Sequence, residues 1–303
     1  MNKIALRPGG LKVSRLVSGL WRLNDSKDIL GNRLNLLEKR IEGCIEVGIT
    51  TFDHADIYGD YSCQESFGSR LHRSPHLRDQ MEIITKAGVN LLSEKFPARK
   101  VKHYNLSQNH LTTSLETSLK ELRTDWVDLF LLHRPDPLMN VDETAATLDL
   151  LVEQGKTRYV GVSNFLPTQI DLLQSRMKTP LMTNQVELSA LNPEGFIDGT
   201  LDYCQRQQLK LMAWSPMAGG QLFQKESKKQ QKVHNALSHL AQKYSIEISQ
   251  AALSWLLYHP AEIIPVIGSN NLERITKAAE ALAISLSRED WYLVWEASQG
   301  EVP

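Results

Sequence analysis

The sequence predicts one α/β domain over residues 1–303, folded as a (β/α)8 (TIM) barrel with an N-terminal β-hairpin and an additional C-terminal helix. Two observations predict this class. Short, strongly apolar runs alternate with stretches of helical periodicity, which is the pattern of a parallel sheet with connecting helices. In addition, no Pro/Gly/Ser-rich linker and no abrupt change of composition divides the chain. We therefore expect a single barrel rather than two domains.

The strands are expected where an apolar run is short and is bounded by polar or turn residues. Before them, Arg7-Pro8-Gly9-Gly10 predicts the turn of a hairpin. The candidate barrel strands cover residues 16–20, 50–53, 82–86, 127–132, 159–163, 181–186, 209–214 and 263–267.

The helices are expected between these strands, and the clearest covers residues 107–123. There Ser107 resembles an N-cap, and Leu111, Leu115 and Leu119 recur at helical spacing. The other candidates cover residues 36–47, 64–71, 141–153, 167–174, 197–207, 231–244 and 272–282, and a final helix over 288–297 could cover one end or side of the barrel. Long loops over 24–35, 88–105 and 217–229 follow strands, so we expect them to govern substrate choice.

Charge and cysteine content narrow the class of protein. The formal net charge is -1, from 34 basic and 35 acidic residues, so the whole surface is not that of a nucleic-acid or anionic-membrane binder. The mixed run over residues 225–232 is expected to be a solvated loop or helix face. No signal peptide or membrane span is recognised, and three scattered cysteines suit a reducing compartment. We expect a cytoplasmic protein without nucleic-acid or membrane partners.

Polar residues at the ends of neighbouring strands predict a shared site. Asp53, Lys86 and His133 each close an apolar run, and Tyr58 follows Asp53 closely. Carboxyl ends of barrel strands meet at one face, where catalytic groups of such barrels lie. Reduction of a carbonyl group needs a proton donor and a group that polarises the carbonyl. Tyr58 could be the donor, Lys86 could lower the pKa of Tyr58, Asp53 could balance the charge of Lys86, and His133 could orient the carbonyl.

The chain resembles the aldo-keto reductases over nearly its whole length. The resemblance rests on Gly19-Leu20-Trp21, Asp53-His54-Ala55-Asp56-Ile57-Tyr58-Gly59, Ile84-Thr85-Lys86, Asp125-Trp126-Val127-Asp128-Leu129 leading to Leu132-His133, Gly161-Val162-Ser163-Asn164-Phe165, Asn184-Gln185-Val186-Glu187 and Trp214-Ser215-Pro216-Met217. The matching residues form the family's catalytic tetrad. The resemblance therefore implies those roles for Asp53, Tyr58, Lys86 and His133.

The resemblance also implies a nicotinamide cofactor, bound in extended form across the barrel mouth. The absence of G-x-G-x-x-G from the sequence is in keeping with this family. By analogy with the family, the carboxamide is contacted by Ser163, Asn164 and Gln185, and the nicotinamide ring stacks on Trp214. The pyrophosphate is followed by Ser215, Pro216 and Met217. The adenosine end is matched by Gly268, Ser269 and Arg274. Arg274 offers forked donors for a 2′-phosphate, so NADPH (NADP) is favoured over NADH.

This sequence departs from well-known members at the adenosine end. Gly268 stands where they carry a basic residue, Asn270 where some branches carry arginine, Lys277 where they carry an acid, and Ala278 where they carry asparagine. Lys277 could contact the phosphate instead, or lie on an exposed helix face. The strength of the NADPH preference is left open.

Several residues near these motifs have more than one interpretation. Trp21 matches an aromatic residue of the family's substrate pocket, together with His133, although strand-end packing would also explain it. His54 and Asp56 are expected to turn away from Asp53 by strand alternation and to support the turn. Cys63 could be reactive or inertly packed.

Three alternative functions differ in chemistry. A class I aldolase could use Lys86 as a Schiff base, but would leave the segments at Ser163 and Trp214 without a role. A metal-dependent hydrolase is disfavoured because His72 and His76 are separated by Pro75, and no metal site is predicted. A third alternative is an NADPH-binding regulatory or redox-sensing subunit with little turnover. We expect a monomeric enzyme acting on a small carbonyl substrate whose identity the sequence does not define.

Overall fold

The protein is described by a computed structural model over residues 3–25 and 33–301. Within these ranges, eight parallel strands close a barrel in the order β10-β11-β12-β3-β4-β5-β8-β9, which confirms the predicted fold class. The strands are β3 (Val17–Gly19), β4 (Thr51–Asp53), β5 (Glu82–Ala87), β8 (Val127–Leu132), β9 (Thr157–Ser163), β10 (Leu181–Glu187), β11 (Met212–Trp214) and β12 (Ile264–Ile267). Each overlaps a predicted run.

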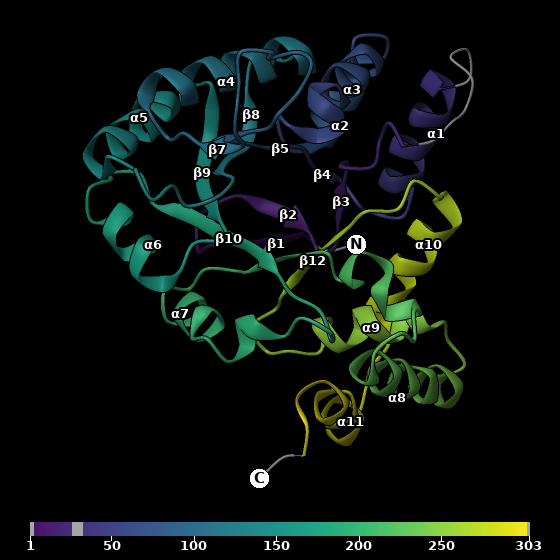
Figure 1. The fold of residues 1–303 in the computed structure, drawn as a ribbon. Helices are drawn as coiled ribbons and strands as arrows, with labels where there is room; N and C mark the ends of the chain where they lie inside the picture. The colour runs from purple at the N-terminus through teal and green to yellow at the C-terminus, as the bar shows by residue number, and fades with distance from the viewer. Residues whose placement is uncertain (1–2, 26–32, 302–303) are drawn as a thin grey trace.

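Helices surround this barrel (Figure 1). They are α1 (Arg33–Glu46), α2 (Tyr58–Tyr61), α3 (Cys63–Leu71), α4 (Gln108–Leu122), α5 (Val141–Glu153), α6 (Pro167–Gln174), α7 (Thr200–Arg206), α8 (Lys228–Tyr244), α9 (Ile248–Leu257), α10 (Leu272–Glu280) and α11 (Arg288–Gln299). Short 3-10 turns cover Pro75–Gln80, Glu194–Phe196, Ala218–Phe223 and Ala281–Ala283. The Ser107 hydroxyl accepts a hydrogen bond from the His110 amide, so the predicted N-cap is present.

The N-terminal hairpin closes the amino end of the barrel. Strands β1 (Lys3–Ala5) and β2 (Lys12–Ser14) pair antiparallel around the predicted turn, where the Gly10 amide donates to the Arg7 carbonyl at 2.9 Å. Leu6 and Leu11 are buried with Ile84 and Leu129 in the barrel interior. The hairpin therefore fills the end of the barrel away from the predicted site, and its strands lie inside the helical ring (Figure 1).

The strands are apolar throughout because both of their faces are buried. In β8, Leu129 and Leu131 lie in the interior core, whereas Phe130 and Leu132 pack in the larger core between strands and helices. This is the two-residue alternation of a strand between two apolar layers. The same alternation fixes which strand-end residues face the barrel mouth.

Helix α9 (Ile248–Leu257), which lies between α8 and β12, was not predicted. The sequence analysis assigned the connection between the last two strands to a helix over 231–244. In the structure that helix is α8, and α9 follows it before β12. Helix α9 buries Ala251, Leu253 and Trp255 on several sides. Such a segment lacks the single apolar stripe by which an amphipathic helix is recognised.

The C-terminal helix α11 is held by a cluster of aromatic rings on the outside of the barrel. Trp291 of α11 stacks between Trp255 and Trp295, with ring centroids 5.3 and 5.5 Å apart. The indole N–H groups of Trp255 and Trp291 each donate to the other residue's carbonyl at 3.0 Å. The predicted final helix is therefore fixed to the side of the barrel, next to α8 and α9 (Figure 1).

The long loops contain more order than predicted. The segment over 88–105 includes a small antiparallel ladder between β6 (Val89–Asn90) and β7 (His103–Tyr104). The segment over 217–229 includes a 3-10 turn and the N-cap of α8, Ser227. Of the loop predicted over 24–35, residues 26–32 lie outside the described residues.

Helices α3 and α4 approach so closely at Gly68 that we expect any side chain there to destabilise the protein. A Cβ atom at Gly68 would lie 2.0 Å from the Glu121 carbonyl oxygen and 2.6 Å from the Leu122 carbonyl carbon. Because backbone atoms cannot rotate away, Gly68→Ala should lower the free energy of unfolding by about 1–3 kcal/mol. Urea unfolding would measure the loss. Gly268→Ala is the matched control, since its Cβ meets nothing within 4 Å; equal losses in the two variants would contradict the prediction.

Candidate active site

Strand alternation directs the predicted catalytic residues to one end of the barrel. Ile84 and Leu131 belong to the interior core, so Lys86 and His133, two residues further on, also face inward. Phe52 packs outward, which turns Asp53 inward. Register confirms that these positions are neighbours, since β4 pairs Asp53 with Ile84, and β5 pairs Lys86 with Leu131. Their side chains meet at the carboxyl ends of the strands.

A buried ion pair forms the base of the site. Lys86 Nζ donates to both carboxylate oxygens of Asp53 at 2.7 Å, and the two side chains are 1% and 2% exposed. Gln185 Nε2 donates to Asp53 Oδ1 at 3.0 Å. Burial lowers the pKa of Lys86, although the Asp53 carboxylate opposes this shift. The Asp53 carboxylate is therefore paired with a cation and hydrogen-bonded, in a buried place where an unpaired charge would destabilise the protein.

Tyr58 and His133 lie beside this pair. Their rings meet edge to face with centroids 6.0 Å apart, and Lys86 Nζ lies 5.1 Å from the centre of the Tyr58 ring. A tight turn directly follows Tyr58 at Gly59, whose φ of 59° is left-handed. A Cβ atom at Gly59 would lie 2.6 Å from the Cys63 sulfur. The structure thus brings together all of the predicted tetrad.

The pKa of Tyr58 is shifted upward in this structure, opposite in direction to the net lowering expected from a neighbouring cation. Burial raises the pKa of Tyr58 well above its ordinary value, the Asp53 carboxylate raises it further, and Arg134 acts in the opposite direction. Lys86 Nζ donates to both oxygens of Asp53 and lies 5.1 Å from the centre of the Tyr58 ring. Tyr58 is therefore a protonated phenol at neutral pH. Burial lowers the pKa of His133 well below its ordinary value, as do the positive charges of Lys86, Arg134 and Lys102, so His133 is neutral.

Asn164 joins the tetrad to the side chains predicted to hold a cofactor. Its Nδ2 donates to the His133 carbonyl at 3.1 Å and to Ser163 Oγ at 2.8 Å, and its Oδ1 accepts from Trp214 Nε1 at 3.0 Å. The Ser163 hydroxyl donates to the Gln185 carbonyl at 2.7 Å. Asn164 adopts a left-handed φ of 62°, as strained residues at functional sites often do. One network therefore spans the ends of β8, β9, β10 and β11.

The remaining predicted residues lie at the ends of β11 and β12. Ser215, Pro216 and Met217 directly follow Trp214, and Ser215 also has a left-handed φ of 54°. Gly268 and Arg274 are exposed, and the Asn271 side chain caps α10 by accepting from the Arg274 amide at 3.0 Å. The Ser269 hydroxyl accepts from the Asn271 amide at 3.1 Å. Asn270, one of the departures noted above, donates from Nδ2 to the Arg22 carbonyl at 2.5 Å.

Two arginines at the site were missed by the sequence analysis. Arg40 of α1 is buried and donates to the side chain of Asn270, to Ser18 Oγ and to the Gly19 carbonyl. It occupies the apolar stripe of its helix, which is an unusual place for a cation and could have indicated a buried role. Arg134 directly follows His133, and its guanidinium carbon lies 5.5 Å from the centre of the Trp214 ring. Its position at a strand end could have singled it out.

Three further residues of the predicted set have defined surroundings. Trp21 is 63% exposed after β3, and its role in substrate binding stays a prediction. His54 packs edge on against Phe67 of α3, with centroids 4.5 Å apart, and so turns away from Asp53 as expected. Burial raises the pKa of Cys63 to about 11, which opposes thiolate formation, and the residue is buried.

Asp56 is a buried acid whose ionisation should make stability depend on pH. Its Oδ1 is buried without a hydrogen-bond partner among the described residues, and burial raises the pKa of Asp56 to about 8. The folded protein then holds a proton that the unfolded chain loses near pH 4, so stability falls as pH rises from about 4 to about 8. We expect Asp56→Asn to stabilise the protein by at least about 1 kcal/mol at pH 8 and to give little gain at pH 4. Urea unfolding of both proteins at the two pH values tests this; an equal gain at both would contradict it.

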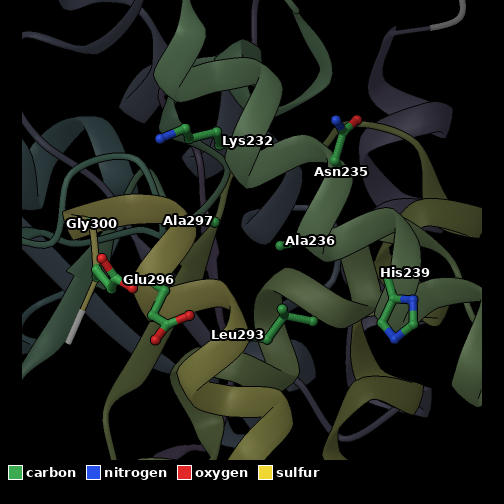
Figure 2. A pocket seen from close by; sticks show the side chains of 9 residues that line it. Lys232, Asn235, Ala236, His239, Leu293, Glu296, Ala297 and Gly300 are labelled. Atoms are coloured by element: carbon green, nitrogen blue, oxygen red, sulfur yellow. The ribbon is translucent and has the colours of Figure 1, made fainter.

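Hollows on the described surface include one on the outside of the barrel and one near its mouth. The larger, of about 570 Å³, lies between α8 and α11 on the outside of the barrel, and Lys232, His239 and Glu296 are among the side chains around it (Figure 2). It contains none of the predicted site residues. A smaller hollow of about 380 Å³ lies between the loops after β5 and β8, lined by Lys102 to Tyr104 and by Asp136 to Leu138. One of the two loops that line the smaller hollow begins just after His133 and Arg134 in the sequence.

Fold and site together define a (β/α)8 oxidoreductase, and the chain belongs to the aldo/keto reductase family, whose sequence profile matches residues 15–298. It is 44% identical to the uncharacterized oxidoreductase YcsN of Bacillus subtilis, over 96% of each chain. It is 42% identical to the 6-dehydroglucose reductase of Agrobacterium fabrum, over 99% of each. The crystal structure of the thermostable aldo-keto reductase Tm1743 with the inhibitor epalrestat is similar, with a TM-score of 0.82 at 27% identity, over 98% of this chain and 100% of that one.

These comparisons confirm the resemblance inferred from the motifs and support carbonyl reduction by an oxidoreductase of this family. They disfavour the aldolase alternative, in which Lys86 would have to be free to attack a carbonyl, whereas here both oxygens of Asp53 engage it. Among the described residues, no helix is long and apolar enough to cross a membrane, and no group of three or more His, Cys, Asp or Glu side chains could hold a metal ion.

Proposed function

We propose that this protein reduces an aldehyde or ketone to the alcohol with NADPH, and that Tyr58 donates the proton. The observation that carries the proposal is the position of Tyr58 and His133 beside the buried Lys86–Asp53 pair. A proton donor and a carbonyl-orienting group then lie together at the mouth of the barrel, as carbonyl reduction requires.

The protonation states support this division of roles. Tyr58 retains its proton because burial raises the pKa of its phenol, so it can donate when negative charge develops on the carbonyl oxygen. His133 is neutral because burial and the nearby cations lower its pKa. A neutral imidazole presents one N–H, which can hydrogen-bond the carbonyl oxygen and orient it. Lys86 and Asp53 supply a fixed ion pair beside these groups.

The residues at the barrel mouth fit a nicotinamide dinucleotide. Trp214 is partly exposed and its ring is held by Asn164, so it offers a fixed aromatic face. Gly268, directly after β12, leaves open space, and the side chain of Arg274 on α10 is exposed. When bound, NADPH supplies the hydride. Ser163, Asn164 and Gln185 would hold its carboxamide, Ser215 to Met217 would follow its pyrophosphate, and Ser269 and Arg274 would hold its adenosine end.

A titration followed by a turnover assay tests the proposal. NADPH is titrated into the purified protein while nicotinamide fluorescence is followed, and carbonyl compounds are then added while absorbance at 340 nm reports oxidation. The panel should include hydroxylated aldehydes, because a relative is named 6-dehydroglucose reductase. Saturable binding with carbonyl-dependent oxidation would support a reductase. Binding without turnover on any carbonyl would favour a regulatory subunit, and absence of binding would contradict the cofactor assignment.

Arg274 should distinguish NADPH from NADH. If its guanidinium holds the 2′-phosphate, Arg274→Gln should raise the Kd of NADPH about 10-fold or more and leave the Kd of NADH almost unchanged, because NADH has no such phosphate. Fluorescence titration of both cofactors measures this. Lys277→Gln is the matched control, since Lys277 lies one turn further along α10 and contacts Glu280 at 3.4 Å. A larger effect from Lys277→Gln would assign the phosphate contact to that residue instead.

A further inference from the structure

We propose that Arg134, with Lys102 on the neighbouring loop, forms an anion-binding subsite that selects carbonyl substrates carrying a carboxylate or phosphate group. The inference deepens the proposed function and rests on it, because it concerns the part of the substrate next to the carbonyl.

The position of Arg134 follows from the network around Asn164. Arg134 is the residue after His133 at the end of β8, and its guanidinium carbon lies 5.5 Å from the centre of the Trp214 ring on β11. Asn164 holds both anchors, because it donates to the His133 carbonyl and accepts from the Trp214 indole. The guanidinium thus extends across the mouth of the barrel from the β8 end, and its side chain is partly exposed there.

The charge of Arg134 has no counterion in the described part of the protein. Within residues 3–25 and 33–301, no carboxylate forms an ion pair with Arg134, and no oxygen accepts a hydrogen bond from its guanidinium. By contrast, Lys86 of the same mouth is matched by Asp53. An arginine carries its charge at every physiological pH and offers five donors in a planar fork, which matches carboxylate and phosphate oxygens. A substrate oxyanion would supply the missing partner.

A second cation faces the same region. Lys102 is exposed in the loop after β5 and lines the hollow of about 380 Å³ together with residues 136–138 of the loop that follows Arg134. The acid in this hollow, Asp136, is already used: its Oδ1 accepts from the Leu138 amide at 2.9 Å and its Oδ2 from the Leu106 amide at 3.3 Å. Its carboxylate is thus engaged by the loop backbone, whereas neither cation has an ion-pair partner among the described residues.

Matched pairs of substrates test the subsite. Values of kcat/KM with NADPH are measured for 4-oxobutanoate against butanal, and for glycolaldehyde phosphate against glycolaldehyde. We expect the protein to prefer at least one anionic member about 10-fold or more, and Arg134→Gln to lower that preference ratio about 30-fold, as expected for the loss of a charge-assisted pair. Arg134→Lys should retain part of the ratio, since it keeps the charge but loses the fork. The ratio is insensitive to the fraction of folded protein.

Arg158→Gln is the matched control. Arg158 also has its guanidinium over a tryptophan, 4.9 Å from the ring centre of Trp126, but it lies near the start of β9, at the opposite end of the barrel. The Arg158→Gln substitution removes the same charge as Arg134→Gln but should leave the preference ratio unchanged. A preference for only the carboxylate or only the phosphate would support the subsite and identify its anion.

Other outcomes overturn the inference. Oxidation of NADPH with equal kcat/KM for charged and neutral partners would show a reductase without this subsite, and so would an unchanged ratio in Arg134→Gln. Absence of oxidation with every carbonyl would instead overturn the proposed function and this inference with it.

Discussion

Tyr58→Phe is expected to lower kcat by about 10²-fold or more, as for the loss of a general acid. The substitution removes only the phenolic oxygen. It should leave the ring contact with His133, the Lys86–Asp53 pair and the barrel fold in place. Single-turnover oxidation of bound NADPH, followed at 340 nm after mixing with a reactive aldehyde, measures the effect directly.

Two measurements separate this prediction from a general loss of structure. The Kd of NADPH should be the same in Tyr58→Phe and in the unaltered protein, because the phenol is not among the groups proposed to hold the cofactor. Tyr292→Phe removes the same atom from a partly exposed residue of α11 and should leave kcat unchanged. Turnover in Tyr58→Phe equal to that of the unaltered protein would remove Tyr58 from the mechanism.

Lys86→Met is expected to lower the free energy of unfolding by about 3–5 kcal/mol, because it leaves the buried Asp53 carboxylate without its cation. Methionine preserves most of the side-chain volume, so the loss reports the charge rather than a cavity. After the substitution, only the hydrogen bond from Gln185 Nε2 would still reach Asp53 Oδ1. Urea unfolding measures the change, and carbonyl-dependent turnover should fall as well.

A partner substitution and a surface pair test the cause. Adding Asp53→Asn to Lys86→Met removes the stranded charge, so the double variant should regain part of the lost stability. Lys156→Met breaks the more exposed pair with Glu116 and should cost no more than about 1 kcal/mol. A loss from Lys86→Met as small as that from Lys156→Met would show that the buried pair is not important for stability.

The barrel and its tetrad were predictable because their signals are local. The strands are largely apolar runs, and a polar residue closes those that carry the tetrad, as His133 follows Leu132 and Lys86 follows Ile83-Ile84-Thr85. Because parallel strands end at one face, the sequence positions of these residues were sufficient to bring them together. Ser163, Asn164 and Gln185 follow the same logic, and the structure joins them to Asp53 through hydrogen bonds.

The remaining features depend on contacts that a linear pattern does not contain. Helix α9 is buried on several sides, so it has no amphipathic stripe to reveal it. The pKa of Tyr58 is raised by burial of the phenol and by the Asp53 carboxylate, and the depth of that burial does not follow from strand ends alone. The proposed role of Arg134 depends on its contact with Trp214, which lies 80 positions away in the chain but close to it in space.

The stacked tryptophans that join α11 to α9 give the protein an internal optical reporter. Parallel indoles at centroid distances of 5.3 and 5.5 Å couple their electronic transitions. Near-ultraviolet circular dichroism should therefore carry a strong signal from Trp255, Trp291 and Trp295 that depends on the docking of α11. Since this cluster lies on the outside of the barrel and Trp214 at its mouth, detachment of the C-terminal helix and occupation of the mouth can be followed as separate spectroscopic events in one sample.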